Sequence, residues 1–115
     1  MKRRRYLVAS VVALAGFGAL FSVLPSQGSG LKVRIVDFRY RPAVIRIAAG
    51  GAITFQNDST LVHTASCIGC RADSGDIQPG TLRTVTFPNA GTYQLFCRYH
   101  GQRGMVARLT VTPSG

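Results

Sequence analysis

Apolar and polar residues alternate along most of the chain after residue 30, and this pattern is the main structural signal in the sequence. In the first such segment, Leu31, Val33 and Ile35 alternate with Lys32 and Arg34, so one face is apolar and the other is charged. A period of two residues is typical of strands that bury one face. The same pattern predicts strands over residues 31–35, 43–47, 52–56, 81–87, 92–97 and 105–111.

The segments between these strands contain the residues that usually form turns. They include Gly50-Gly51, Asn57-Asp58-Ser59 and Pro88-Asn89-Ala90-Gly91. No window after residue 30 has a convincing apolar stripe with the 3.6-residue period of a helix. Short strands separated by regular turn signals predict an all-β domain, namely an antiparallel β-sandwich with Greek-key connections.

A different pattern occupies residues 1–30. Four basic residues at positions 2–5 precede an uncharged, mostly apolar run at 6–24, and a short linker follows up to Gly30. This order is that of an export signal. As a helix, the run would be about 28 Å long, which is close to the hydrocarbon thickness of a bilayer, so it could also remain as an N-terminal membrane anchor. We therefore expect an export signal or anchor helix at 1–30, a folded domain at 31–115, and a periplasmic or other extracytoplasmic location.

The chain is strongly basic, with a formal net charge of +10 at pH 7. Lys32 and nine arginines stand against four aspartates after residue 30, which leaves the predicted domain at +6. A basic exported domain suits an acidic protein partner or anionic lipid headgroups. Nucleic acid is not expected as a partner, because the arginines alternate along strands and do not cluster with stacking aromatic residues.

Three cysteines in an exported chain leave one cysteine unpaired. Cys67 and Cys70 are separated by two residues, one of them Gly69, which would ease the tight turn of a short disulfide. A redox-active Cys-x-x-Cys pair is less favoured, because such motifs open a helix and this one lies in a predicted loop. We favour a structural disulfide, with an auxiliary metal site as the alternative.

The remaining cysteine, Cys97, belongs to the spacing Cys97-x2-His100-x4-Met105, and His63 lies upstream. A thiolate, two imidazoles and a thioether are the ligands of a blue-copper electron-transfer site. The strand pattern puts Cys97 and Met105 on inward faces and His100 in the loop between them. Taken singly, such residues usually belong to the core or the surface, so the prediction of a copper site depends on the combination. Zinc is less favoured because it rarely takes a thioether.

These residues and several others form a longer pattern between Phe38 and Val111, with which the sequence resembles a cupredoxin of the plastocyanin, pseudoazurin and amicyanin branch. The resemblance implies that His63, Cys97, His100 and Met105 bind one copper ion. It also implies a hydrogen bond from the backbone N–H of Thr64 to the Cys97 sulfur. The matching marks are Phe38-x3-Pro42-x2-Ile45, Gly51-x-Ile53-x-Phe55-x-Asn57-Asp58, His63-Thr64, Asp73-Ser74-Gly75, Pro79-Gly80 and Gly91-Thr92-Tyr93-x3-Cys97-x2-His100-x3-Gly104-Met105.

The function predicted from these features is one-electron transfer between redox proteins by a monomer that is not an enzyme. Four protein ligands leave no open position on the metal, and the chain has no further histidines for a second copper centre. We expect His100 to be the electron exit, and Arg98 and Arg103 beside it to face an acidic partner. The alternatives are a non-catalytic copper-binding or delivery module, the small copper subunit of a larger oxidoreductase, and a metal-free interaction domain.

Overall fold

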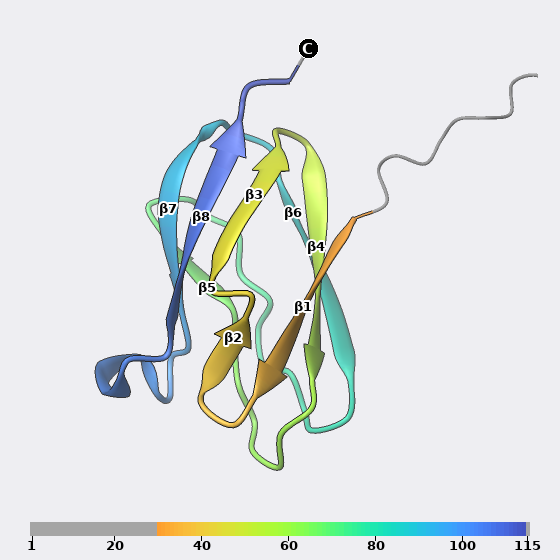
Figure 1. The fold of residues 1–115 in the computed structure, drawn as a ribbon, viewed down its shortest axis with the longest axis vertical. Coiled ribbons are helices and arrows are strands. Elements are labelled where there is room, and N and C mark those ends of the chain that lie inside the picture. The colour runs from red at the N-terminus through yellow and green to blue at the C-terminus, as the bar shows by residue number, and fades with distance from the viewer. Residues whose placement is uncertain (1–29, 115) are drawn as a thin grey trace, which may run out of the picture.

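The computed structural model describes residues 30–114, which form two four-stranded β-sheets facing each other across a common core (Figure 1). The strand order is β2-β1-β4-β6 in the first sheet and β3-β8-β7-β5 in the second. A single 3-10 turn, η2, is the helical element among the described residues. The bounds are β1 Leu31–Val36, β2 Arg39–Arg41, β3 Val44–Ala48, β4 Gly51–Asn57, β5 Ser66–Ile68, β6 Leu82–Phe87, β7 Gly91–Phe96, η2 Gly101–Arg103 and β8 Val106–Thr112.

The predicted β-sandwich is confirmed, but the prediction that all its strands are antiparallel is wrong. Strand β1 runs parallel to β4, and β3 runs parallel to β8, whereas the other pairs are antiparallel. The chain passes from one sheet to the other at each connection between β2 and β7, so neighbours within a sheet are often distant in sequence. Such crossover connections allow parallel pairing, and an alternating pattern gives no information on strand direction.

The core lies between the sheets and is built from the inward faces that the alternation predicts. Val33 and Ile35 of β1 are fully buried, whereas Lys32 and Arg34 between them are exposed. The burial of such side chains, at about 25 cal/mol per Å² of apolar surface, is the main stabilising contribution in a domain of this size. The buried hydrophobic residues are Val33, Ile35, Tyr40, Ile45, Ile53, Phe55, Ala65, Ile77, Val85, Phe87, Leu95, Cys97, Met105, Ala107, Leu109 and Val111.

Three connections meet at one end of the sandwich, the lower end in Figure 1. These are the β1–β2 hairpin, the segment after β4 and the β7–β8 connection that contains η2. The β1–β2 hairpin turns within two residues because Val36 pairs with Arg39. Asp37 in this turn has a φ of 54°, in the left-handed region that Asp tolerates better than most residues. The tight turn brings Phe38 to this end of the molecule.

The expected N-terminal signal or anchor helix at residues 6–24 and the linker up to residue 29 lie outside the described residues. Within residues 30–114, no helix has the length and apolar character needed to cross a membrane.

Candidate metal centre

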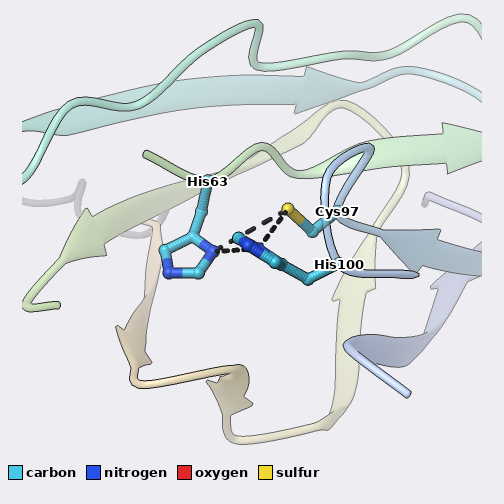
Figure 2. A group of neighbouring side chains, drawn as sticks. All are labelled: His63, Cys97 and His100. Atoms are coloured by element: carbon cyan, nitrogen blue, oxygen red, sulfur yellow. Dashed lines mark hydrogen bonds between the residues drawn. The ribbon is translucent and has the colours of Figure 1, made fainter. Parts of the chain in front are cut away.

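The end of the sandwich holds His63, Cys97 and His100 with their side chains turned toward one another (Figure 2). Cys97 Sγ lies 3.7 Å from His63 Nδ1 and 3.5 Å from His100 Nδ1. The two Nδ1 atoms are 3.2 Å apart. One residue comes from the segment after β4 and two come from the β7–β8 connection, so the group forms only when the domain has folded.

This triangle of donor atoms has the right size for a transition-metal ion. A point equidistant from three atoms with separations of 3.2, 3.5 and 3.7 Å lies about 2.0 Å from each of them. Bonds from a divalent metal to a histidine nitrogen are about 2.0–2.1 Å long, and bonds to a cysteine sulfur are about 2.3 Å long. An ion therefore fits among the three side chains with only small adjustments.

The backbone around His63 is fixed by a pair of hydrogen bonds with Ile77. The His63 amide donates to the Ile77 carbonyl at 3.3 Å, and the Ile77 amide donates to the His63 carbonyl at 2.7 Å. The buried side chain of Asn57 donates to the carbonyls of Ile77 and Leu61, both at 2.8 Å. The Asn57 oxygen accepts from Ser59, so the whole amide group is paired. These bonds set the approach of His63 to the site.

The other two side chains are held by the short connection between β7 and β8. The Cys97 carbonyl accepts hydrogen bonds from the amides of His100 at 3.3 Å and Gly101 at 2.7 Å. The Cys97 amide donates to the Met105 carbonyl at 3.2 Å. Gly104 ends the η2 turn with a φ of 92°, which a residue with a side chain rarely adopts, and the chain then enters β8. Met105, which is 1% exposed, comes directly before this strand, and its carbonyl is bonded to Cys97.

Comparison with known proteins identifies the family. The family model for the cupredoxin-like domain matches residues 7–111 of this chain. The chain belongs to the cupredoxin family. It is 31% identical to the chloroplastic plastocyanin of Tetradesmus obliquus over 94% of this chain and 81% of that protein. It is 25% identical to the plastocyanin of Prochlorothrix hollandica over 96% of this chain and 95% of that protein.

A solved structure supports the same assignment. The crystal structure of amicyanin from Paracoccus versutus aligns with this cupredoxin with a TM-score of 0.62 and 25% identity, over 76% of this chain and 84% of amicyanin. The metal of this cupredoxin is copper, which a thiolate together with two imidazoles suits in both of its common oxidation states.

Thr64 connects the His63 side of the site to the Cys97 side through its hydroxyl. The hydrogen bond from the Thr64 amide to the Cys97 sulfur stays a prediction. The Thr64 hydroxyl accepts from the Arg98 amide at 2.9 Å and contacts Ser66 Oγ at 3.0 Å. Its carbonyl accepts from the buried Tyr40 hydroxyl at 2.5 Å. Sequence reasoning missed Tyr40, because nothing in an alternating pattern distinguishes this contact from ordinary packing.

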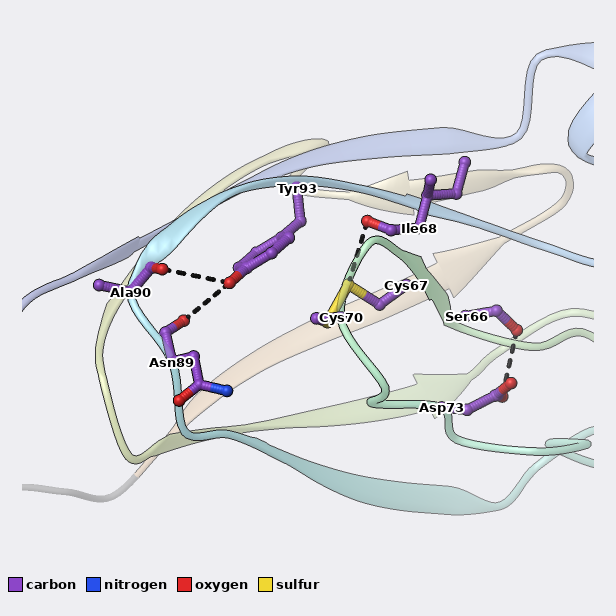
Figure 3. The surroundings of a disulfide bond; sticks show 8 residues. All are labelled: Ser66, Cys67, Ile68, Cys70, Asp73, Asn89, Ala90 and Tyr93. Atoms are coloured by element: carbon purple, nitrogen blue, oxygen red, sulfur yellow. Dashed lines mark hydrogen bonds between the residues drawn. A yellow bond between two sulfur atoms is a disulfide. The ribbon is translucent and has the colours of Figure 1, made fainter.

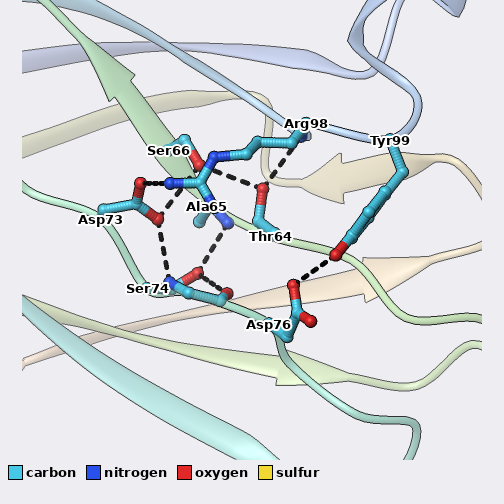
Figure 4. Close-up of polar contacts among 9 residues, drawn as sticks. Thr64, Ala65, Ser66, Asp73, Ser74, Asp76, Arg98 and Tyr99 are labelled. Carbon is cyan, nitrogen blue, oxygen red and sulfur yellow. Dashed lines mark hydrogen bonds and ion pairs between the residues drawn. The ribbon is translucent and has the colours of Figure 1, made fainter.

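Arg98 is exposed, but its guanidinium forms an ion pair within the cupredoxin. Its guanidinium pairs with Asp73, which also accepts from Ser66 Oγ at 3.1 Å (Figure 4). Two bonds between Ala65 and Ser74 lie beside this pair, one from the Ala65 amide to Ser74 Oγ and one from the Ser74 amide to the Ala65 carbonyl. Asp73 therefore compensates part of the charge of Arg98, and docking of a partner at Arg98 stays a prediction.

The site is buried on all sides except at His100. His63 and Cys97 are fully buried, whereas His100 is only half-buried. An apolar rim formed by the exposed side chains of Phe38, Leu61 and Tyr99 surrounds this part of the molecule. The Phe38 ring meets the His100 ring edge to face, with centroids 4.8 Å apart. Phe38 was noted in the sequence only as a family mark, because its contact with His100 depends on the tertiary fold.

The electrostatic environment favours a neutral His63. Burial lowers the pKa of the His63 imidazole below its ordinary value, and the neighbouring His100 ring lowers this pKa further. The backbone of Asp37 opposes the shift only weakly, since His63 Nε2 has no hydrogen-bond partner of good geometry. A neutral ring with its proton on Nε2 leaves the Nδ1 lone pair directed at the centre of the site. This is the protonation state that metal binding requires.

The two tyrosines near the site keep their protons at ordinary pH. Burial raises the pKa of Tyr40, and the nearby Cys97 and Asp73 raise it further. The Tyr99 hydroxyl donates to Asp76 at 2.7 Å, and this hydrogen bond raises the pKa of Tyr99. Both hydroxyl groups therefore act as hydrogen-bond donors in this region.

The predicted disulfide between Cys67 and Cys70 is confirmed (Figure 3). It closes the loop at the end of β5, with a Cα–Cα distance of 5.5 Å. Cys97 is the free cysteine among the described residues and is buried. Because both sulfurs of the pair are used in the bond, neither is available as a thiolate ligand in this state.

Proposed function

We propose that this cupredoxin is a one-electron carrier whose copper ion is bound by His63, Cys97, His100 and Met105. The observation that carries the proposal is the triangle formed by Cys97 Sγ and the two Nδ1 atoms, with edges of 3.2–3.7 Å. Bound copper would supply a Cu(I)/Cu(II) couple, to which a thiolate and two imidazoles are suited. The buried thioether side chain of Met105, next to Cys97, suits the role of a weak axial ligand.

The surroundings of the proposed ligands suit electron transfer better than catalysis. Three of the four residues are buried, which limits the access of a substrate to the metal. His100 is the proposed electron exit, because its ring lies at the partly exposed edge among the apolar rim residues Phe38, Leu61 and Tyr99. An apolar rim allows a partner to exclude water and approach the histidine closely.

The alternative functions have less support. A copper-delivery module would need exchangeable thiolates, and the pair best suited to that role forms a disulfide. The small copper subunit of a larger oxidoreductase would need further metal ligands, and both histidines of the chain are already used by this site. Electron transfer by a monomer requires neither exchangeable thiolates nor further metal ligands.

Export and an acidic partner complete the proposal. The basic, then apolar, order of residues 1–30 supports export to an extracytoplasmic compartment, with a membrane anchor at 6–24 as one form of it. Arg103 lies exposed in η2, near His100, and supports docking of an acidic redox protein. Arg98 supports it less, since its charge is compensated by Asp73.

The absorption spectrum of the oxidised, copper-loaded protein tests the ligand assignment. We expect an intense blue or green colour from charge transfer between the Cys97 thiolate and Cu(II), and its complete loss in Cys97→Ala. The matched control is the double variant Cys67→Ser/Cys70→Ser, which removes two sulfurs and should keep the colour. A colourless loaded protein, or a colour that survives Cys97→Ala, would contradict the proposed function.

A further inference from the structure

The outer face of the first sheet carries a compact group of basic residues. Lys32 and Arg34 point outward from β1, and Arg39 and Arg41 point outward from β2, while Tyr40 between the last two is buried. Arg34 and Arg41 are direct partners in the antiparallel ladder, so the two side chains leave neighbouring positions on this face. We call Lys32, Arg34, Arg39 and Arg41 the basic face.

Acidic residues of this chain compensate the basic face only in part. Arg34 donates to Asp58 at 2.6 Å, and Gln56 holds the same carboxylate at 2.7 Å. The hydrogen bond from Gln56 lowers the pKa of Asp58 most, and the bond from Arg34 lowers this pKa further. The Asp58 carboxylate therefore stays ionised. Lys32, Arg39 and Arg41 form no ion pair with any residue in the range 30–114. The face therefore keeps most of its positive charge.

This arrangement has a cost for folding. Like charges placed opposite each other in an antiparallel pair destabilise the sheet. Neutral polar side chains would cover the same surface without that cost, as Thr54 and Thr84 do on β4 and β6, where their hydroxyls lie 2.9 Å apart. The basic face is thus better explained by recognition of an anion than by stability.

The position of the face relates it to the proposed electron exit. The hairpin that joins β1 to β2 ends in Phe38, whose ring lies 4.8 Å from that of His100. Arg39 follows Phe38 directly in the chain. A surface that covers the basic face near Arg39 therefore continues onto the apolar rim next to His100. One partner protein can therefore contact the basic face and the proposed electron exit at His100 at the same time.

We propose that the basic face binds the acidic surface of a redox partner protein and orients it with its cofactor toward His100. This inference rests on the proposed function and names the part of the surface that selects the partner. Arginine suits the role because its planar guanidinium forms paired hydrogen bonds with a carboxylate. Opposite charges also raise the association rate, and salt screens this effect.

The second sheet provides a matched control, because its outer face carries two arginines in a different setting. Arg46 of β3 and Arg108 of β8 are exposed there beside the exposed valines Val44 and Val106. Reversal of two charges on this face changes the net charge by the same amount as reversal of two charges on the basic face. The two double variants therefore separate a local docking effect from a general effect of charge.

The experiment uses the full-length, copper-loaded protein and measures its second-order electron-transfer rate with a soluble acidic c-type cytochrome at several ionic strengths. Arg39→Glu/Arg41→Glu should lower the rate at least about tenfold at low salt and flatten the salt dependence. Arg46→Glu/Arg108→Glu should stay within about twofold of the wild type. Unchanged copper spectra show that both variants are folded. If the reversed basic face does not fold, Lys32→Gln/Arg41→Gln replaces it, with a smaller loss expected.

Three outcomes would overturn the inference. Equal slowing by both double variants would show that only net charge matters. An unchanged rate for the basic-face variant would assign docking to the apolar rim and Arg103 alone. Binding of the wild type to phosphatidylglycerol vesicles, lost in the basic-face variant while the cytochrome rate is kept, would show that the face binds a membrane. Failure of the proposed function is distinct, because the wild type would then lack the copper colour or exchange no electrons.

Discussion

At the scale of single residues, Met105 is the proposed ligand whose role is hardest to separate from packing. It is buried beside Cys97, as either a ligand or a core residue would be. Met105→Leu should keep copper bound and raise the reduction potential, because the weak axial donor that favours Cu(II) is lost. Leu109→Met, in the core part of the strand β8 that follows Met105, is a volume-conserving control that should leave the potential unchanged. If Met105→Leu also leaves the potential unchanged, Met105 serves only as packing.

Tyr40 offers a second prediction, which concerns stability. Its hydroxyl donates to the Thr64 carbonyl in the buried layer behind the copper site. Tyr40→Phe should lower the free energy of unfolding by about 1–3 kcal/mol, because a buried carbonyl loses its partner. The control is Tyr93→Phe, whose hydroxyl contacts the Asn89 and Ala90 carbonyls in an exposed setting where water can replace it. Denaturant unfolding of the two variants measures the difference, and equal losses would contradict the argument.

The proposed ligands were found from the sequence, whereas the residues around them were not. A thiolate, two imidazoles and a thioether form a rare combination, so residue types and spacing are enough to select them. The ion pair between Arg98 and Asp73 and the ring contact of Phe38 join parts of the chain that only the fold brings together. Such contacts follow no local rule.

At the scale of elements, the alternating pattern located the longer strands, and it failed where strands are short. Each of the six predicted segments overlaps an observed strand. Strands β2 and β5 were missed because a segment of three residues is too short to show a period of two. Strand direction was also missed, since parallel and antiparallel strands bury one face in the same way. The predicted faces were right, because burial depends on side-chain alternation and not on direction.

The disulfide at the end of β5 leads to a prediction at this scale. Cys67→Ser/Cys70→Ser should lower the free energy of unfolding by about 2 kcal/mol, at the low end for disulfides, because the closed loop is very short. Copper colour should persist, since Cys97 is untouched. Thiol counting on the unfolded, metal-free wild type should give one free thiol. Three free thiols, or a stability equal to that of the wild type, would show that the bond does not form in solution.

At the scale of the whole molecule, the two ends of the sandwich have different roles. Strand β1 enters the sheet at the end opposite the copper site and runs about 20 Å to the hairpin next to it (Figure 1). Leu31 and the group of His63, Cys97 and His100 therefore lie at opposite ends of the domain.

The last prediction tests the boundary of the domain. A chain of residues 31–115 should fold, bind copper and keep the spectrum and reduction potential of the full chain, because the core begins at Val33 and the proposed ligands lie at the far end. A chain of residues 37–115 is the control and should not fold. It lacks β1, which pairs with both β2 and β4 and buries Val33 and Ile35 completely. Burial of two such side chains contributes roughly 3–6 kcal/mol, a large part of the roughly 5–15 kcal/mol that stabilise a typical domain. Thermal unfolding and absorption spectra of both chains would test this prediction. If the chain of residues 37–115 folds and turns blue, the boundary at residue 31 is contradicted.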